Sequence, residues 1–566
     1  MLSDPTVSFL RTLHAKKVNR RQLIATAAAV PAASLLAGPA VLVSPARRAS
    51  AQMDPRTLVI LDNIQGGNWL YFDPGRFYEI NPTAGLQVTY ETLYHIPDGY
   101  KPGEIVPLLA EDVPAISEDG LTATIKIRPG VKFHNSENEM KAADWVWSWD
   151  RLKNLKGNAS FLITDFMASY KAVDDYTIEI TQLAPNAALV AVLASMMLAV
   201  MDSTAGAEHG GVATETADAD DKLTDWLNEG NSIGTGPYTL TGWDISSEIT
   251  IEANPNYWGE PAGFDRVIFR NVTDTSTQLQ LLETGEADMA FAADPDKMQQ
   301  ILDNPGLQLL EGPSLAFEYV AMHTGEDVGG PLAKKEARQA IAHAIDYQGI
   351  IDGLMGGRAV RPATVVPLGL LGADTVAPNA YQTDLAKANE LWAASGNGPT
   401  ELTLTYGAGQ TAPGGLNRDV LSAKLQADIQ GIEGVTVTLL PMDPTQRLAD
   451  YRAAKLQFTM SDWSPDYVDV HTYADPFGRE GGAAAKRVAY SNPKVDELLD
   501  KGIGEPDVEA REAIYVEIQE ILQDDAAFLV EFQPNYVMPA VASVKGATPH
   551  GVYIIQLRGA KREESA

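Results

Sequence analysis

The chain has 566 residues, of which 45% are hydrophobic and 21% are charged, so it can form about two to four globular domains. Its formal net charge of −32 disfavours nucleic acid and anionic lipid as partners, because such a surface repels phosphate groups. The absence of cysteine excludes disulfides, thiolate metal sites, cysteine nucleophiles, iron–sulfur clusters and a lipid-modified N-terminal cysteine.

Residues 1–51 have the order of a cleaved, twin-arginine-like signal peptide. A basic segment precedes a long apolar, alanine-rich run, and Ala49–Ala51 then offers the small side chains typical of a cleavage site. The motif NRRQLI at Asn19–Ile24 resembles a twin-arginine export signal. A membrane anchor is the alternative, because the run is long enough to span a bilayer, but its prolines and the small residues after it favour cleavage. We therefore predict an exported, periplasmic protein without a lipid anchor.

The rest of the chain mixes strands and helices throughout. In chain order, the first predicted elements are strands at 57–63, 122–128 and 176–181 and a helix at 140–152. The helix places Trp145, Val146, Trp149 and Leu152 on one face. Residues 203–231, which are rich in glycine, alanine and aspartate, predict a loop or junction.

A second series of elements follows this predicted junction. The further predicted strands are 236–243, 247–254, 264–272, 401–406 and 435–442, and the further predicted helices are 275–285, 334–357, 421–430 and 511–526. The strand–helix–strand order between residues 401 and 442 predicts a parallel sheet wrapped by helices. Two α/β lobes with a ligand cleft between them are the natural interpretation.

Motifs for catalysis or cofactor binding are weak. None of the eight histidines belongs to an H-E-x-x-H motif or a close pair, and no G-x-S-x-G motif occurs. The acidic run Ala217–Asp221 lacks the glycine and final glutamate of a calcium loop, so it predicts a solvated loop. Residues 407–412 match G-x-G-x-x-A, but proline and glycine interrupt the place where a nucleotide-binding helix should begin. We therefore predict no catalytic residue, no metal and no cofactor.

One stretch combines residue types that rarely share an environment. Residues 462–477 read DWSPDYVDVHTYADPF, with carboxylates interspersed among aromatic rings. A solvated acidic loop does not need the rings, and a packed core does not favour the charges. The stretch is therefore a candidate for ligand binding.

Four blocks in the same order resemble the extracellular solute-binding proteins of family 5, the peptide, dipeptide and nickel type receptors of ABC importers. The blocks are Tyr90–Leu152, Gly234–Gly259, Glu336–Gly357 and Asp462–Phe477. Together they are spread over most of the chain behind the predicted signal. The resemblance implies an α/β, two-lobed type II periplasmic-binding-protein fold with an extra subdomain (cluster C type).

The resemblance also implies the domain boundaries. The discontinuous lobe I would comprise residues 54–84, 232–310 and 533–566, with the extra subdomain at 85–231 and lobe II at 311–532. The chain would cross between the lobes near residues 310–325 and 525–535, where a hinge closes the cleft over the solute. The protein would act as a monomer, deliver its solute to an ABC permease in the cytoplasmic membrane, and catalyse nothing.

In peptide-binding relatives, an aspartate in a W-x-x-D motif pairs with the α-ammonium group of the ligand. Trp463-Ser464-Pro465-Asp466 matches this motif, so the resemblance implies Asp466 as the ligand anchor, and a carboxylate in a closed cleft gains strongly from a cation. Trp463, Tyr467 and Tyr473 would supply apolar walls or cation–π contacts, and His471 could touch the ligand. The alternative is that Asp466 caps a local turn and the rings pack in the core.

The ligand class stays open at this stage. Dipeptide receptors of the family hold the ligand carboxylate with an arginine from the loop before "LQAD", and Arg418 does not fall convincingly in that place. An oligosaccharide would want stacking rings, which Trp69, Tyr71 and Phe72 could provide, although a packed core is an equally good interpretation of them. The sequence is also compatible with a metal chelate as the ligand of the same fold, and with a secreted two-lobed hydrolase.

Overall fold

A computed structural model describes residues 54–66, 69–97, 104–291 and 297–563, which form mixed α/β structure. The predicted signal at 1–51 lies outside the described residues. Within the described ranges, no helix combines the length and the apolar character that a bilayer crossing requires.

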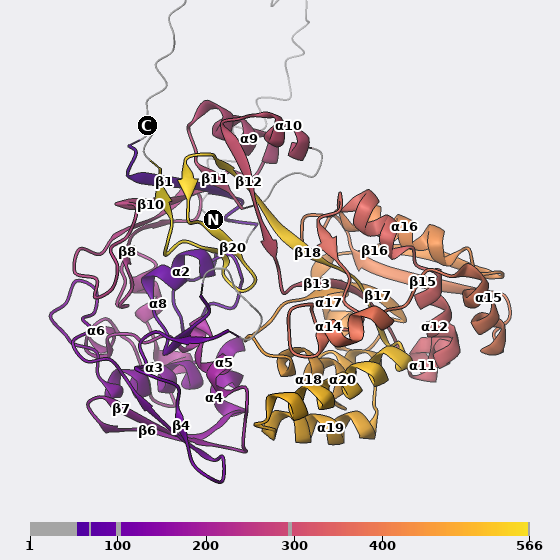
Figure 1. The fold of residues 1–566 in the computed structure, drawn as a ribbon, viewed down its shortest axis with the longest axis horizontal. Coiled ribbons are helices and arrows are strands. Elements are labelled where there is room, and N and C mark those ends of the chain that lie inside the picture. Colours follow the sequence, from indigo (N-terminus) through magenta and orange to yellow (C-terminus); the bar gives the residue numbers. More distant parts are fainter. Residues whose placement is uncertain (1–53, 67–68, 98–103, 292–296, 564–566) are drawn as a thin grey trace, which may run out of the picture. The chain divides into compact units, whose positions relative to one another are not determined.

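The largest element is a mixed sheet of 12 strands, ordered β16-β15-β17-β13-β18-β11-β1-β10-β9-β8, with β12 and β14 also paired to β18 (Figure 1). Its strands are β1 (Thr57–Asp62), β8 (Tyr238–Asp244), β9 (Glu248–Ala253), β10 (Arg266–Asn271), β11 (Met289–Ala290), β12 (Leu307–Pro313), β13 (Phe317–Met322), β14 (Ala359–Val360), β15 (Thr400–Gly407), β16 (Val435–Met442), β17 (Phe458–Trp463) and β18 (Phe528–Val541). The pairing of β15 with β16 and β17 is parallel, which confirms the parallel sheet predicted between residues 401 and 442.

The long strand β18 joins the two halves of this sheet. Its first residues pair with β13, where Phe528 lies opposite Ala321, and its later residues pair with β12, where Val541 lies opposite Leu307. Figure 1 shows β12 and β18 running side by side between the two halves. Only residues 314–316 separate β12 from β13, so both connections cross where the sequence predicts a hinge. Hinge motion itself stays a prediction.

The strand β13 separates two hydrophobic cores. Successive side chains of a strand point to opposite faces. Tyr319 packs into one core, which also contains Phe477 and Phe528, while Val320 packs into the other beside Leu529. Strand β13 is therefore buried on both faces, which explains its almost uninterrupted apolar sequence.

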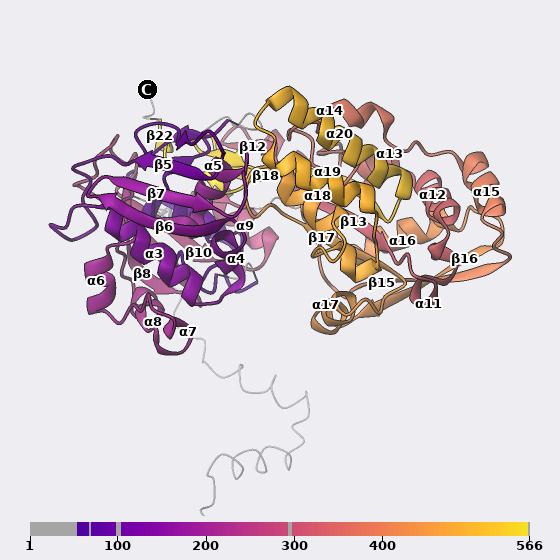
Figure 2. The same cartoon turned by 90° about the horizontal axis from the view of Figure 1, so that it is seen from below.

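A separate antiparallel sheet of four strands forms part of the predicted extra subdomain. Its order is β4-β5-β7-β6, built from β4 (Ala115–Ile116), β5 (Thr122–Lys126), β6 (Met167–Asp174) and β7 (Thr177–Gln182). The helix α3 (Ala142–Asn154) lies against this sheet (Figure 2), and Trp145, Trp149 and Leu152 on its inner face are buried. The amphipathic face predicted from the sequence is thus confirmed for these three residues, while Val146 is only half-buried. The domain boundaries remain predictions.

Helices cover the large sheet and close the remaining cores. The helices outside the segments discussed separately are α2 (Thr83–Thr89), α4 (Phe161–Thr164), α5 (Leu189–Leu193), α9 (Thr275–Thr284), α10 (Met298–Asp303), α11 (Glu326–Gly329), α14 (Ala373–Val376), α15 (Leu385–Ala394), α16 (Arg418–Ile429), α17 (Pro444–Arg452), α18 (His471–Gly478), α19 (Pro493–Gly504) and α20 (Val508–Asp525). The short strands are β2 (Tyr94–His95), β3 (Val106–Pro107), β19 (Val544–Lys545), β20 (Thr548–His550), β21 (Ile554–Gln556) and β22 (Lys561–Arg562). The predicted helices at 275–285, 421–430 and 511–526 correspond to α9, α16 and α20 and are confirmed.

The loop predicted at residues 203–231 is wrong in part, because the segment contains α6 (Ser203–Glu208), α7 (Ala217–Asp220) and α8 (Leu223–Leu227). The acidic run is also not a solvated loop throughout. Asp221 at its end is buried, and Arg151 from α3 donates to it at 2.8 Å and to Asp73 at 2.7 Å. An arginine 70 residues away neutralises this carboxylate, and nothing local in the run indicates it.

The single helix predicted at 334–357 is also wrong. Helix α12 (Lys335–Ala344) ends at Ile345, whose ψ of 128° is extended. The Asp346 side chain then accepts a hydrogen bond from the Gly349 amide at 2.9 Å and begins α13 (Tyr347–Gly349), which continues as a π-helical turn over Ile350–Leu354. Aspartate competes with the helix for backbone donors in this way, so the apolar stripe continues across a break in the helix.

Candidate ligand-binding site

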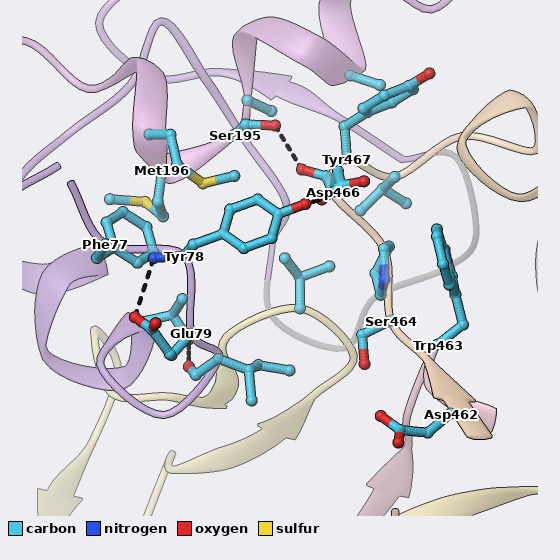
Figure 3. Close-up of a pocket in the computed structure, with 18 of the residues that line it drawn as sticks. Phe77, Tyr78, Glu79, Ser195, Met196, Asp462, Trp463, Ser464, Asp466 and Tyr467 are labelled. Atoms are coloured by element: carbon cyan, nitrogen blue, oxygen red, sulfur yellow. Dashed lines mark hydrogen bonds between the residues drawn. The ribbon is translucent and has the colours of Figure 1, made fainter. Parts of the chain in front are cut away.

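Three neighbouring cavities meet around the segment that follows β17. The central cavity has a volume of about 440 Å³ and lies between residues 77–80 and 194–197 on one side and residues 461–468 on the other (Figure 3). The second cavity, of about 690 Å³, extends toward residues 158–166 and 183–186. The third, of about 340 Å³, is lined by residues 411–415 and 535–537, among others. The central cavity shares wall residues with both others.

Asp466 lies on the wall between the central and second cavities. The Tyr78 hydroxyl donates a hydrogen bond to its carboxylate at 2.5 Å, and the Ser195 hydroxyl donates to its backbone carbonyl at 3.0 Å (Figure 3). Burial raises the pKa of Asp466, and the Tyr78 hydrogen bond lowers it only in part. No ion pair forms at this carboxylate among the described residues. A half-buried anion with neutral partners is the arrangement in which a cationic ligand group gains most.

Trp463 and Tyr467 line the central and second cavities together with Asp466. Trp463 ends β17, and its ring lies edge-on to Phe477 with centroids 5.1 Å apart. Tyr467 is almost fully buried, and its ring meets Phe166 edge-on at 5.6 Å. The motif therefore brings one carboxylate and two aromatic side chains to the same place.

Of the three cavities, His471 lines only the second. Its Nδ1 lies 2.8 Å from the Tyr515 hydroxyl. Burial lowers the pKa of His471 below its ordinary value, despite the nearby carboxylates of Asp475 and Asp469, so the ring is neutral at physiological pH. It can offer a ligand a hydrogen bond but not a positive charge.

Tyr473 and Trp69 line none of these three cavities. The Tyr473 side chain is fully buried and its hydroxyl donates to the Leu315 carbonyl at 2.5 Å. Trp69 is equally buried, and its indole donates at 2.7 Å to Asp62, which lines the third cavity. A direct ligand contact by either ring would require the surrounding core to open, so the structure favours packing for both.

Other residues on the cavity walls carry no signal in the sequence. Tyr78, 388 residues from Asp466, donates to its carboxylate. Arg447, Arg452 and Arg487 also line the central cavity. No motif surrounds these four residues in the sequence, so only the fold brings them to the site.

Replacing Tyr78 with phenylalanine should shift the pH dependence of binding. If a ligand ammonium pairs with Asp466, as the sequence predicts, its affinity should fall as pH falls through the pKa of Asp466. Tyr78→Phe removes the donor that lowers this pKa, so the loss of affinity should begin at a higher pH than in the wild type. Calorimetric titration with a free-amino peptide between pH 4 and 7 measures this midpoint.

Tyr71→Phe provides the control, because the Tyr71 side chain lies outside the three cavities. Its acid midpoint should equal that of the wild type. An identical midpoint in Tyr78→Phe would show that the hydroxyl does not act on Asp466.

Arg418 is engaged inside the protein. It begins α16, and its guanidinium donates to both carboxylate oxygens of Glu318 at 2.8 Å and to Asp462 at 2.5 Å. A second buried carboxylate, Glu531 on β18, has no hydrogen-bond partner among the described residues. Burial and the charge of Glu318 raise the pKa of Glu531 well above its ordinary value, and Arg418 offsets this only in part.

This carboxyl should make stability depend on pH. Because the pKa of Glu531 in the folded chain lies well above the value of about 4.3 in the unfolded chain, the folded state binds more protons at pH values between the two. Its contribution therefore falls as pH rises from about 4.3 through the folded pKa, with a slope of at most ~1.4 kcal/mol per pH unit. The difference in unfolding free energy between wild type and Glu531→Gln should fall as pH rises above about 5 in urea titrations. Glu520→Gln, on the exposed side of α20, should show a constant difference, and a constant difference for Glu531→Gln would contradict the assignment.

No cluster of three or more histidine, aspartate or glutamate side chains suited to a metal ion occurs in the described part of the chain. The walls of the central cavity combine the carboxylates of Glu79, Asp462 and Asp466 with aromatic side chains and arginines.

Residues 104–485 match the family described as "Bacterial extracellular solute-binding proteins, family 5 Middle". The chain is 25% identical over 433 residues to the "Probable D,D-dipeptide-binding periplasmic protein DdpA" of Escherichia coli (strain K12), covering 76% of this chain and 80% of that protein. It is 26% identical over 480 residues to the "Glutathione-binding protein GsiB" of Salmonella typhimurium, covering 82% of this chain and 87% of that protein.

A solved structure has the same fold. The periplasmic binding protein DppA from Helicobacter pylori, in complex with peptide STSA, matches with a TM-score of 0.72 at 23% identity, covering 90% of this chain and 98% of that chain. This agreement confirms the α/β, two-lobed fold expected from the resemblance. Since the family match spans most of the chain, the protein belongs to the bacterial extracellular solute-binding proteins of family 5.

Proposed function

We propose that the protein captures a peptide or peptide-like solute with a free amino group in the central cavity, as the solute-binding component of an ABC importer. The observation that carries this proposal is the half-buried Asp466 carboxylate, whose hydrogen-bond donor is the neutral hydroxyl of Tyr78. The names of the dipeptide-binding and glutathione-binding relatives support the same ligand class. The cavity volume of about 440 Å³ lies within the range of about 300–1,000 Å³ typical of small-ligand sites.

Each wall has a distinct part in capture. Asp466 pairs with the ligand ammonium, and Trp463 and Tyr467 exclude water on either side of it. Closure about β18 and the 314–316 connection would dry the cleft, which strengthens the charge pair. The solute is released unchanged, and catalysis is not part of this function.

The predicted export signal implies where the mature protein would act. The signal at 1–51 would be removed, and the mature protein would act as a periplasmic monomer that docks on an ABC permease in the cytoplasmic membrane. Its strong negative charge disfavours binding to anionic lipid itself, so docking relies on the permease.

A thermal-shift screen of the purified protein tests the ligand class. The ligands are short peptides with free amino termini, the same peptides N-acetylated, cello- and xylo-oligosaccharides, and nickel with small chelators. A ligand at 100 times its dissociation constant adds about 2.7 kcal/mol to the unfolding free energy, which gives a clear shift. Stabilisation by free but not acetylated peptides supports the proposal. Stabilisation by oligosaccharides or chelates alone would overturn the ligand class, and turnover of a ligand would favour a hydrolase.

A further inference from the structure

Where the structure describes the chain, the arginines that line the central cavity lack the ion pairs that most other basic residues of this acidic protein form. The chain has 75 acidic and 43 basic residues, so carboxylates are abundant. Buried and half-buried arginines elsewhere commonly form ion pairs, as do Arg151, Arg418, Arg511, Arg558 and Arg562. Arg447, Arg452 and Arg487 line the central cavity, and within the described ranges none of them forms an ion pair.

Arg487 is held by aromatic rings. It lies in the 3-10 turn Ala485–Val488, and its guanidinium carbon lies 5.2 Å from the ring centroid of Tyr451 and 5.6 Å from that of Trp463. Its Nε is buried and has no hydrogen-bond partner in the described part of the chain. Cation–π contacts orient a guanidinium without using its N–H donors, so the donors remain for another acceptor.

Arg452 provides a second charge on the same wall. It ends α17 and, like Arg487, Trp463 and Asp466, lines both the central and the second cavity. Burial and Asp466 raise the pKa of Tyr78, and the positive charge of Arg452 acts in the opposite direction. Arg452 therefore acts on the same hydroxyl that contacts Asp466.

Arg447 has a different environment. Its Nη1 donates to the Met460 carbonyl at 2.8 Å, and its side chain is almost fully buried. Burial lowers its pKa, with Arg418 lowering it further and Asp462 raising it. Arg447 thus belongs to the buried network around Arg418, which leaves Arg452 and Arg487 as the cations available to a ligand.

We propose that Arg487 and Arg452 form a subsite for an anionic carboxylate group of the ligand. This inference rests on the proposed function and narrows its substrate class to solutes that carry both an ammonium and a carboxylate. Asp466 forms an ion pair with neither arginine, so the site presents separate negative and positive poles. One zwitterionic ligand can satisfy both poles, and guanidinium groups bind carboxylates through paired hydrogen bonds. The carboxylate is either the C-terminus of a short peptide or an acidic side chain.

Calorimetric titration with three peptides distinguishes these sources. The peptides have free amino termini and are a neutral peptide acid, its C-terminal amide, and an amide with one acidic side chain. Arg487→Gln should weaken binding of the carboxylate-bearing peptides at least tenfold, because a desolvated charge pair is lost, and should change binding of the neutral amide less than threefold. A selective loss for the peptide acid identifies the C-terminus, and a selective loss for the acidic amide identifies the side chain.

The neighbouring Lys486→Gln is the matched control, because it removes the same charge from the same turn outside the cavities, and it should leave all three affinities unchanged. Arg452→Gln repeats the test at an exposed position, which keeps it informative if Arg487→Gln does not fold. Equal effects of both arginine substitutions on acid and amide peptides would overturn the subsite while leaving peptide binding established. If the wild type binds none of the peptides, the proposed function fails and the subsite with it.

Discussion

Asp466→Asn is expected to weaken the binding of a free-amino peptide by on the order of 2–5 kcal/mol, or about 30-fold and more. The substitution keeps the shape of the side chain but removes the charge that pairs with the ligand ammonium. The Tyr78 hydroxyl can still donate to the amide oxygen, so the local fold should persist. Calorimetry with the free peptide measures the loss, and the affinity for a neutral oligosaccharide, if it binds, should barely change.

Two control substitutions test whether the loss of affinity is specific to Asp466. Asp175→Asn removes an exposed carboxylate outside the three cavities and should leave the affinity unchanged. Glu79→Gln removes a second carboxylate of the central cavity, whose third carboxylate, Asp462, is already paired with Arg418. If Glu79→Gln abolished binding and Asp466→Asn did not, the anchor would be Glu79 and our assignment would be wrong.

Arg151→Met is expected to lower the unfolding free energy by about 3–5 kcal/mol. Arg151 is fully buried between Asp73 and Asp221, with Thr224 as a further neighbour, so its removal leaves two buried carboxylates without a charge partner. Urea unfolding at pH 7 measures the change. Lys156→Met breaks the exposed pair with Asp218 on the same side of the fold and should cost no more than about 1 kcal/mol.

The cost of Arg151→Met should also depend on pH. Burial by itself raises the pKa of Asp73, but Arg151 and the hydrogen bonds from Thr224 and Gly75 outweigh it, so the pKa lies below its ordinary value. The ion pair therefore stabilises the fold above about pH 3.9, the pKa of the unfolded aspartate, and this stabilisation is lost as pH falls through the lower folded pKa. The difference between wild type and Arg151→Met should shrink in acid, and a constant difference would contradict the role of charge.

Local patterns predicted much of the fold. The strands at 57–63, 401–406 and 435–442 correspond to β1, β15 and β16 because their residues are buried or alternate within the same short run. The break after α12 escaped prediction because one aspartate side chain, Asp346, competes with the helix while the apolar stripe continues. The helices at 203–227 escaped because each is short and depends on packing against distant residues.

The candidate site likewise contains residues that a local motif identifies and residues that only the fold brings together. Asp466, Trp463 and Tyr467 lie within five residues of sequence, so one motif identifies all three. Tyr78, Arg452 and Arg487 come from separate segments that meet only in the folded chain, and no periodicity or motif connects them. Tyr473 and Trp69 show the reverse case, since both are aromatic candidates from the sequence that are buried and line none of the three cavities.

The position of β18 has a consequence for how the chain is made. Residues 528–541 supply a strand that lies in the middle of the large sheet and pairs with β11, β12, β13 and β14. A chain still emerging from the ribosome holds both halves of the sheet without their shared strand until almost the last residues are synthesised. Long-range pairings of this kind form late and slowly. Neither half of the sheet can therefore finish folding before β18 is made. A chain truncated before residue 528 should leave both halves of the sheet incomplete.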